Sequence, residues 1–144
     1  MVDEDPSFLA RLPGGFAVMG DAQFLPGYSL LLPDDPEATR LTDLPRATRL
    51  EYLASLEHLA EALELACKQA DPAFRRVNIE ILGNTEPRLH AHVWPRYDWE
   101  DPELVLGPVW LYPEERWHEP ATALGPQHDS LRAAIKENLN RLTR

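Results

Sequence analysis

The sequence predicts an α+β fold, in which short strands come first and a long helix separates them from a later pair of strands. The early strands are the apolar stretches at residues 16–19 and 28–32, and the helical pattern runs over about residues 43–70. The later pair, at 77–82 and 89–94, is closely connected in sequence, which favours antiparallel neighbours. The βαβ alternation and Gly-rich fingerprint of a dinucleotide-binding fold are absent.

The first elements are bounded by turn signals. Residues 1–15 are expected to form a loose N-terminal arm that ends in Pro13-Gly14-Gly15. The strand at 16–19 follows, and a turn at 20–23 leads toward the strand at 28–32. Asp34-Asp35-Pro36 then breaks this second strand.

The long helix has a clear start and end. Thr42 or Asp43 is the expected cap, Pro45 lies in the first turn, and Asp71-Pro72 ends the helix after about Ala70. Its apolar residues recur at helical spacing, which predicts one buried stripe. The members of this stripe are Leu50, Leu53, Leu56, Ala60, Leu63 and Cys67.

The second half of the chain begins with alternating strands. Val77, Ile79 and Ile81 alternate with polar or outward residues, and a tight connection at Gly83-Asn84 leads into the next strand. The stretch 98–124 is rich in Pro and Trp and is expected to be irregular. Asp129 or Ser130 caps a final helix, whose apolar side is formed by Leu131, Ile135, Leu139 and Leu142. We expect a single domain over residues 1–144, with 98–144 as the irregular segment and final helix.

Charge and composition exclude some classes of protein. A net charge of −10 argues against a non-specific nucleic-acid-binding protein, because a phosphate backbone needs a basic surface, although one local pocket can still bind a small anion. The one cysteine, Cys67, cannot form an internal disulfide, which favours a reducing compartment. The acidic start lacks a secretory signal pattern, and no apolar run has membrane-spanning length. We therefore expect a cytoplasmic protein.

The most informative stretch is the alternating strand that begins after Asn84 and Thr85. Because successive strand residues take opposite faces, one face carries Leu89, Ala91 and Val93. The other face carries Arg88, His90, His92 and Trp94. Two imidazoles and a guanidinium on one surface, with an amide and a hydroxyl just upstream, can hold a phosphate and attack it with a nitrogen.

These residues resemble the histidine triad (HIT) family of nucleotide hydrolases and transferases. The family pattern is His-φ-His-φ-His-φ-φ, where φ is apolar, often followed by Pro-Arg; residues 88–96 fit it, except that Arg88 stands at the first His position. The flanking Leu82-Gly83-Asn84 and Pro95-Arg96-Tyr97 are similar to bacterial members of the diadenosine tetraphosphate hydrolase type. Residues 24–33 resemble the Pro-Gly-His-like strand entry, with Tyr28 at the usual His position. The resemblance covers roughly residues 15–97.

The resemblance implies a fold and a set of roles. It implies an antiparallel sheet of about five strands with helices on one face and a nucleotide on the other, and a homodimer with the two sheets side by side. His90 would be the nucleophile that forms a nucleotidyl-histidine, and His92 would donate a hydrogen bond to the phosphate. The further contacts implied are Arg88, Asn84, Thr85 and Asn78 at the phosphates or leaving group, Asp21 at the ribose, and Phe16 and Phe24 beside the adenine.

The leading interpretation is a hydrolase of a nucleoside polyphosphate such as diadenosine tetraphosphate, with phosphoramidates and nucleotidyl sugars as further substrate classes. Because of Arg88 and Tyr28, a nucleotide-binding sensor or partner module with little turnover is the alternative. A metal-dependent hydrolase is a weaker interpretation, because a guanidinium beside the histidines repels a cation. We expect no metal site and no required cofactor, although a divalent cation can accompany a polyphosphate.

Arg88 and the tryptophans leave two questions open. The Arg88 guanidinium either acts on the His90 side of the strand or turns away to pair with Glu86. Three tryptophans, Trp99, Trp110 and Trp117, fall in the irregular segment and indicate a buried interface, which agrees with the expected homodimer.

Overall fold

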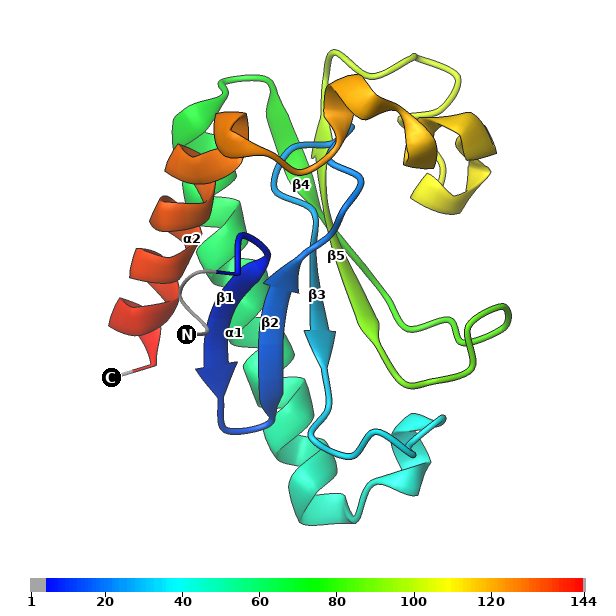
Figure 1. The fold of residues 1–144 in the computed structure, drawn as a ribbon, viewed down its shortest axis with the longest axis vertical. Helices are drawn as coiled ribbons and strands as arrows, with labels where there is room; N and C mark the ends of the chain where they lie inside the picture. The colour runs from blue at the N-terminus through cyan, green and yellow to red at the C-terminus, as the bar shows by residue number, and fades with distance from the viewer. Residues whose placement is uncertain (1–4, 144) are drawn as a thin grey trace.

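The computed structural model describes residues 5–143 and contains one antiparallel sheet with two helices (Figure 1). The five strands lie in the order β1-β2-β3-β5-β4. They are β1 (Phe8–Leu12), β2 (Gly15–Met19), β3 (Ser29–Leu32), β4 (Phe74–Glu80) and β5 (Ala91–Tyr97). The helices are α1 (Arg46–Ala70) and α2 (Asp129–Leu142). The predicted α+β fold, with a long helix and a C-terminal helix, is therefore confirmed.

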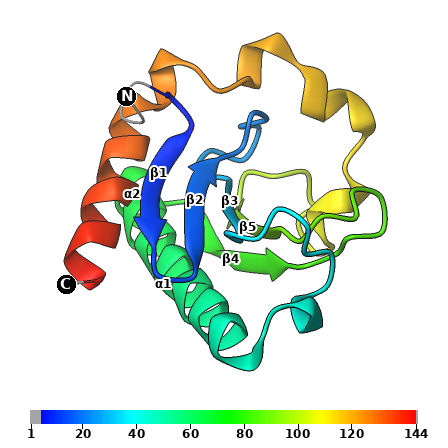
Figure 2. The same cartoon turned by 60° about the horizontal axis from the view of Figure 1, so that its bottom comes forward.

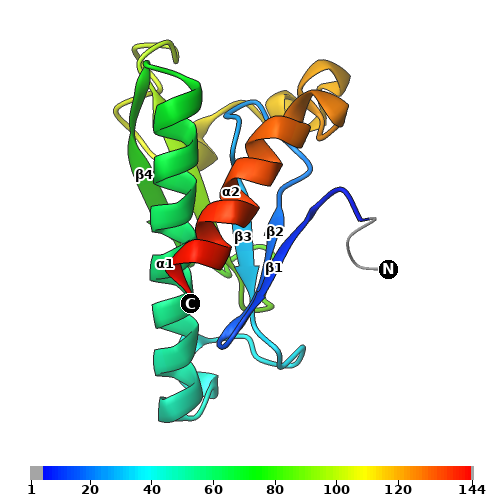
Figure 3. The same cartoon turned by 90° about the vertical axis from the view of Figure 1, so that its left-hand side faces the viewer.

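Both helices cover the same face of the sheet, and they pack against each other (Figure 3). Ala91 and Val93 of β5 point into this layer and are fully buried. Apolar side chains from α1, α2 and the strands complete the core, among them Leu9, Ala17, Leu31, Leu59, Leu63, Ile135 and Leu139. Removing this apolar surface from water is what holds the helices on the sheet.

The N-terminal arm is partly a strand, contrary to the expectation for residues 1–15. β1 pairs antiparallel with β2, and Leu9 and Leu12 are buried. The pairing is irregular between Phe8 and Ala10, which face Val18 and Ala17 of β2. This bulge disturbs the period-two alternation by which a strand is recognised in a sequence. Residues 1–4 of the expected arm lie outside the described part of the chain.

The start and the buried stripe of α1 also differ from the prediction. The helix starts at Arg46 with Pro45 as its N-cap, and the Asp43 carboxylate instead accepts hydrogen bonds from the backbone N–H groups of Thr39 and Arg40. Leu50 and Leu53 are 51% and 36% exposed. The buried face is Tyr52, Ser55, Leu56, Leu59, Ala62, Leu63, Ala66 and Cys67. Tyr52 fixes this rotation of the helix, because its buried hydroxyl donates to the Leu31 carbonyl of β3 at 2.8 Å.

The segment after β5 runs as an arc back to α2, and it contains only short 3₁₀ turns (Figure 2). These turns are Val109–Leu111, Glu114–His118, Pro120–Thr122 and Pro126–His128. The segment is attached through Arg96 of β5, whose buried guanidinium pairs with the buried Glu100 at 2.9 Å. The same guanidinium donates to the carbonyls of Leu104 and Gly107. This network holds the irregular segment against the open face of the sheet.

The final helix agrees with the prediction except at its cap, because His128 is the N-cap and Asp129 is the first helical residue. Ile135 and Leu139 are fully buried against the core. Leu131 and Leu142 pack against the same cluster. None of the helices in the described residues is both long and apolar enough to span a bilayer.

Candidate functional site

The two histidines lie where β5 begins, on the sheet face opposite the helices. β5 starts at Ala91, so His90 is the last residue of the 81–90 connection and His92 is inside the strand. The expected strand over 89–94 and the tight turn at Gly83-Asn84 are therefore wrong in detail. The Leu89 N–H donates to the Ala38 carbonyl at 2.8 Å instead of to a neighbouring strand. Pro87, which has no N–H, favours this irregular connection.

His90 is held in one tautomer by the backbone. Its Nδ1 lies 2.6 Å from the carbonyl oxygen of Arg88. A carbonyl can only accept a hydrogen bond, so Nδ1 carries a proton, and in the neutral form of the ring the lone pair lies on Nε2. The His90 and His92 rings meet edge to face, with their centroids 4.7 Å apart. The arrangement directs Nε2 of His90 away from the backbone, toward a position where a substrate could be attacked.

His92 is held by Tyr28, which comes from the turn before β3. The Tyr28 hydroxyl lies 2.6 Å from Nδ1 of His92, and the Tyr28 ring stacks on Trp94 at 3.5 Å between centroids. Burial lowers the pKa of His92 to about 4, with a smaller contribution from His90. Burial also raises the pKa of Tyr28, helped by the charges of Glu80 and Asp21. Both groups are therefore neutral near pH 7. When the phenol donates to Nδ1, the His92 proton lies on Nε2 and can be given to an oxygen.

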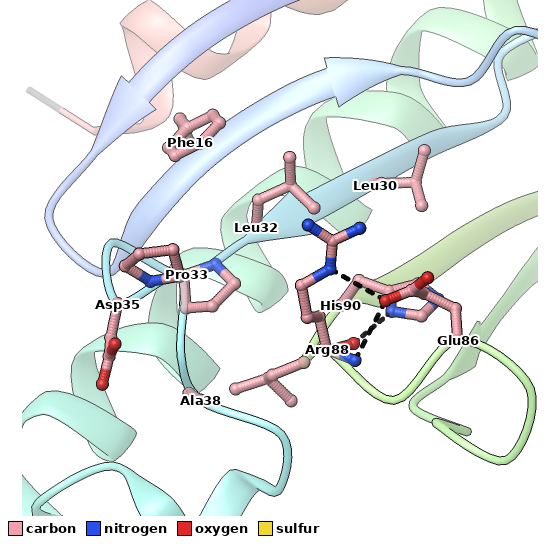
Figure 4. Close-up of a pocket in the computed structure, with 11 residues that line it drawn as sticks. Phe16, Leu30, Leu32, Pro33, Asp35, Ala38, Glu86, Arg88 and His90 are labelled. Carbon is pink, nitrogen blue, oxygen red and sulfur yellow. Dashed lines mark hydrogen bonds and ion pairs between the residues drawn. The ribbon is translucent and has the colours of Figure 1, made fainter.

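A cavity of about 410 Å³ opens beside His90 (Figure 4). Its floor is apolar, with Phe16 from β2, Leu30 and Leu32 from β3, and Pro33 and Ala38 from the following loop. Its polar rim comes from the 81–90 connection, with Glu86, Arg88 and His90, and from Asp35 in the loop after β3. An apolar pocket with a few polar groups at one edge suits a flat ring that carries a charged group.

Arg88 contacts His90 through its backbone and not through its guanidinium. The Arg88 Nε donates to Glu86 Oε1 at 2.9 Å, and these two side chains are 72% and 52% exposed. Arg88 and His90 also do not share a regular strand face, because both precede β5. The side chain at the first triad position therefore lies at the rim of the cavity, and its carbonyl orients His90 (Figure 4).

The remaining predicted residues are divided between the site and other regions. Asn84 and Thr85 are exposed in the 81–90 connection and do not line the cavity. Asn78 lies on β4, and its Oδ1 accepts a hydrogen bond from Arg96 at 2.8 Å. Because that contact fixes the amide, its NH₂ group is directed elsewhere and is available to a ligand.

Two predicted contacts lie away from the cavity. Phe24 is 3% exposed and packs against Trp94, Tyr112 and Trp117, so it cannot flank a ring in this cavity. Burial in an aromatic cluster, which the sequence did not indicate, explains this difference. Asp21 is exposed after β2 and does not line the cavity, although its charge acts on the Tyr28 hydroxyl.

The prediction missed Tyr28 as the partner of His92 and Leu30 and Leu32 as the cavity floor. A signal was available in the spacing of these residues, since Leu30 and Leu32 alternate along β3 and Tyr28 precedes them by the same two-residue step. Among residues 5–143, no three His, Cys, Asp or Glu side chains lie close enough together to hold a metal ion. The expectation that no cofactor is required stays a prediction.

The sequence and the fold are similar to those of known proteins. A family model described as the HIT domain matches residues 7–99. The fold is similar to that of a histidine triad protein from Marinobacter aquaeolei VT8 (20% identity, 94% of this chain and 89% of that chain, TM-score 0.73). It is also similar to a histidine triad protein from Bradyrhizobium japonicum (20% identity, 92% and 89%, TM-score 0.69). A third structure is a hypothetical histidine triad nucleotide-binding protein from Sulfolobus tokodaii strain7 (16% identity, 90% and 80%, TM-score 0.62). No curated protein matches the chain.

Proposed function

The chain belongs to the HIT domain family, and on that premise we propose that it hydrolyses a nucleoside phosphate derivative through a covalent nucleotidyl-His90 intermediate. The substrate class that the motif favours first is a dinucleoside polyphosphate of the diadenosine tetraphosphate type. Phosphoramidates and nucleotidyl sugars carry the same nucleoside phosphate half and belong in the same assay.

One observation carries this proposal, namely the 2.6 Å contact between His90 Nδ1 and the Arg88 carbonyl. It leaves the lone pair on Nε2, which is the state that a nitrogen nucleophile needs. The cavity beside His90 provides a place for the nucleoside, with Phe16 and Leu32 against the base. A phosphate attached to that nucleoside would then lie at the histidines.

The reaction follows in two displacements. In the first, Nε2 of His90 forms a bond to phosphorus, and the bond from phosphorus to the leaving group breaks with its electron pair going to the leaving group. A departing amine also takes up a proton from water as this bond breaks. In the second, water attacks phosphorus, the P–N bond breaks, the electron pair returns to Nε2, and the water proton is released. His92 would donate its Nε2 proton to a phosphoryl oxygen as charge develops. The NH₂ group of Asn78 and the side chains of Asn84 and Thr85 are further candidates for contacts with the phosphate or leaving group.

A nucleotide sensor with little turnover is the second candidate, and the Glu86–Arg88 ion pair favours it. A guanidinium already bound to a carboxylate is less available to stabilise phosphoryl oxygens in the transition state. On this alternative the cavity binds a nucleotide and His90 remains unmodified.

The test is a substrate panel with matched histidine variants. Diadenosine tetraphosphate, an adenosine phosphoramidate and a nucleotidyl sugar would be incubated with the wild type, His90→Ala and His118→Ala. His118 lies exposed in the Glu114–His118 turn, away from the cavity, so it controls for loss of any imidazole. We expect turnover of at least one substrate by the wild type and His118→Ala and its loss in His90→Ala. Binding without turnover by the wild type would support the sensor.

A further inference from the structure

A second cavity lies on the other side of the histidines, over strand β4. It has a volume of about 580 Å³ and lies between β4 and the 105–108 segment. Its polar lining includes Arg76, Asn78, Glu80 and Arg96. The first cavity is mainly apolar and the second is mainly polar, with the histidines between them along the sheet. If the nucleoside lies in the first cavity, this second cavity faces the part of the substrate that would depart.

Glu80 is the residue of this cavity that lies next to the histidines. In the antiparallel pairing of β4 with β5, Glu80 is directly opposite His92. Directly paired residues point to the same face, with Cβ atoms about 4.5–5.5 Å apart. The charge of Glu80 also acts on the hydroxyl of Tyr28, which is bonded to His92. The geometry thus places a carboxylate on the histidine face.

The Glu80 carboxylate is half-buried and unpaired. Within residues 5–143 it forms no hydrogen bond or ion pair. Burial raises its pKa, and the charge of Arg96 partly opposes this. The Arg96 guanidinium cannot turn to meet it, because it is bound by Glu100, Asn78 and two carbonyls. Partial desolvation of a carboxylate without a hydrogen-bond partner costs free energy, and a ligand that donates a hydrogen bond to it offsets that free energy.

We propose that Glu80 is a specificity-determining residue that selects the leaving group of the reaction by its charge. This inference rests on the proposed function and refines it. A leaving group that is cationic, or that donates a hydrogen bond, meets a carboxylate on departure. A polyphosphate meets a like charge at the same place, which disfavours it. Arg76, which also lines the cavity, cannot compensate at that point, because it lies four residues along β4, about 13 Å away. Arg75, the other cation of β4 in this cavity, lies one residue farther and is paired with Asp98 at 3.0 Å.

The experiment uses three adenosine 5′-phosphoramidates that differ only in the charge of the departing amine. The amines are 1,4-diaminobutane, pentylamine and 4-aminobutanoate, and diadenosine tetraphosphate is measured beside them. Each compound is assayed for kcat/KM with the wild type, Glu80→Gln and Glu64→Gln. Glu64 is an exposed acid on α1, on the far side of the sheet, so its variant removes the same charge without touching this face.

The wild type and Glu64→Gln are expected to prefer the diaminobutane compound to the aminobutanoate compound by roughly tenfold. In Glu80→Gln this ratio should fall toward one, and turnover of diadenosine tetraphosphate should rise by a few-fold. The proposal for Glu80 is overturned if the wild type turns over the three phosphoramidates with equal kcat/KM. It is also overturned if Glu80→Gln keeps the wild-type preference for the diaminobutane compound over the aminobutanoate compound.

If none of the four compounds is turned over, and the nucleotidyl sugar of the substrate panel is not turned over either, the proposed function fails, and binding decides the role of Glu80. The three phosphoramidates are then titrated by calorimetry against the wild type and Glu80→Gln. If the wild type binds the diaminobutane compound more tightly than the aminobutanoate compound, and Glu80→Gln does not, then Glu80 selects ligands by charge in a binding protein. An equal Kd for all three with the wild type contradicts it.

Discussion

At the scale of single residues, the contact of Tyr28 with His92 is the simplest to test. Tyr28→Phe removes the hydroxyl 2.6 Å from His92 Nδ1 and keeps a ring to stack on Trp94. Without that donor the His92 proton is no longer confined to Nε2, so kcat should fall roughly tenfold. The tautomer of His92 can be read from ¹⁵N NMR shifts of the imidazole. An unchanged kcat with an unchanged His92 tautomer would show that the hydroxyl has no positioning role.

Arg88 provides a second prediction at this scale. Because its carbonyl and not its guanidinium contacts His90, Arg88→Ala should keep the orientation of His90. The loss of a cation at the cavity rim should raise KM for anionic substrates by roughly tenfold and leave kcat within about threefold. Steady-state kinetics at low and high salt would measure this, since the difference should shrink as salt rises. A collapse of kcat with unchanged KM would instead assign the guanidinium to the transition state.

At the scale of elements, the strands and helices with regular periodicity were predictable, and those fixed by tertiary contacts were not. β2, β3 and α2 follow from alternation or helical spacing, and the structure has them close to the expected bounds, whereas the strand expected at 77–82 is β4 at Phe74–Glu80. β1 contains a bulge, and the face of α1 is turned by the Tyr52 hydroxyl bonding to β3. Neither feature leaves a pattern in the sequence.

The Arg96–Glu100 pair gives a prediction for the segment that it attaches. The two side chains are 2% and 0% exposed, so Arg96→Met leaves a buried carboxylate without its partner. We expect a loss of about 3–5 kcal/mol in the free energy of unfolding, measured by urea denaturation. Arg75→Met, which breaks the exposed pair with Asp98, should cost less than about 1 kcal/mol. Equal effects of the two variants would show that the buried network does not hold the segment.

At the scale of the whole molecule, the chemical groups of the site could be predicted from the sequence of one segment, but the cavity beside them could not. His90, His92 and Arg88 stand in a recognisable motif. The cavity beside them needs two connections, at residues 33–38 and 81–90, which meet through the Leu89–Ala38 hydrogen bond. Which distant loops meet depends on packing across the whole sheet, and the alternation of one strand does not contain that information.

The open edge of the sheet leads to a prediction about assembly. β4 is an edge strand, and Ile79 on it is 48% exposed beside the exposed Ile81 and Leu82. Such an edge tends to be paired or covered, and we propose a symmetric homodimer that pairs here. Ile79→Lys should give a monomer at micromolar concentration by light scattering, whereas Ala133→Lys on the exposed side of α2 should not. A wild-type monomer at the same concentration contradicts this assembly.

The covalent state of His90 during turnover tests the proposed mechanism most directly. Wild-type protein would be mixed with substrate, quenched with base within one turnover, and digested for mass spectrometry. We expect a nucleotidyl group on His90 that is stable in base and lost in acid, present in His118→Ala and absent in His90→Ala. Turnover of substrate with unmodified His90 at every quench time would contradict it.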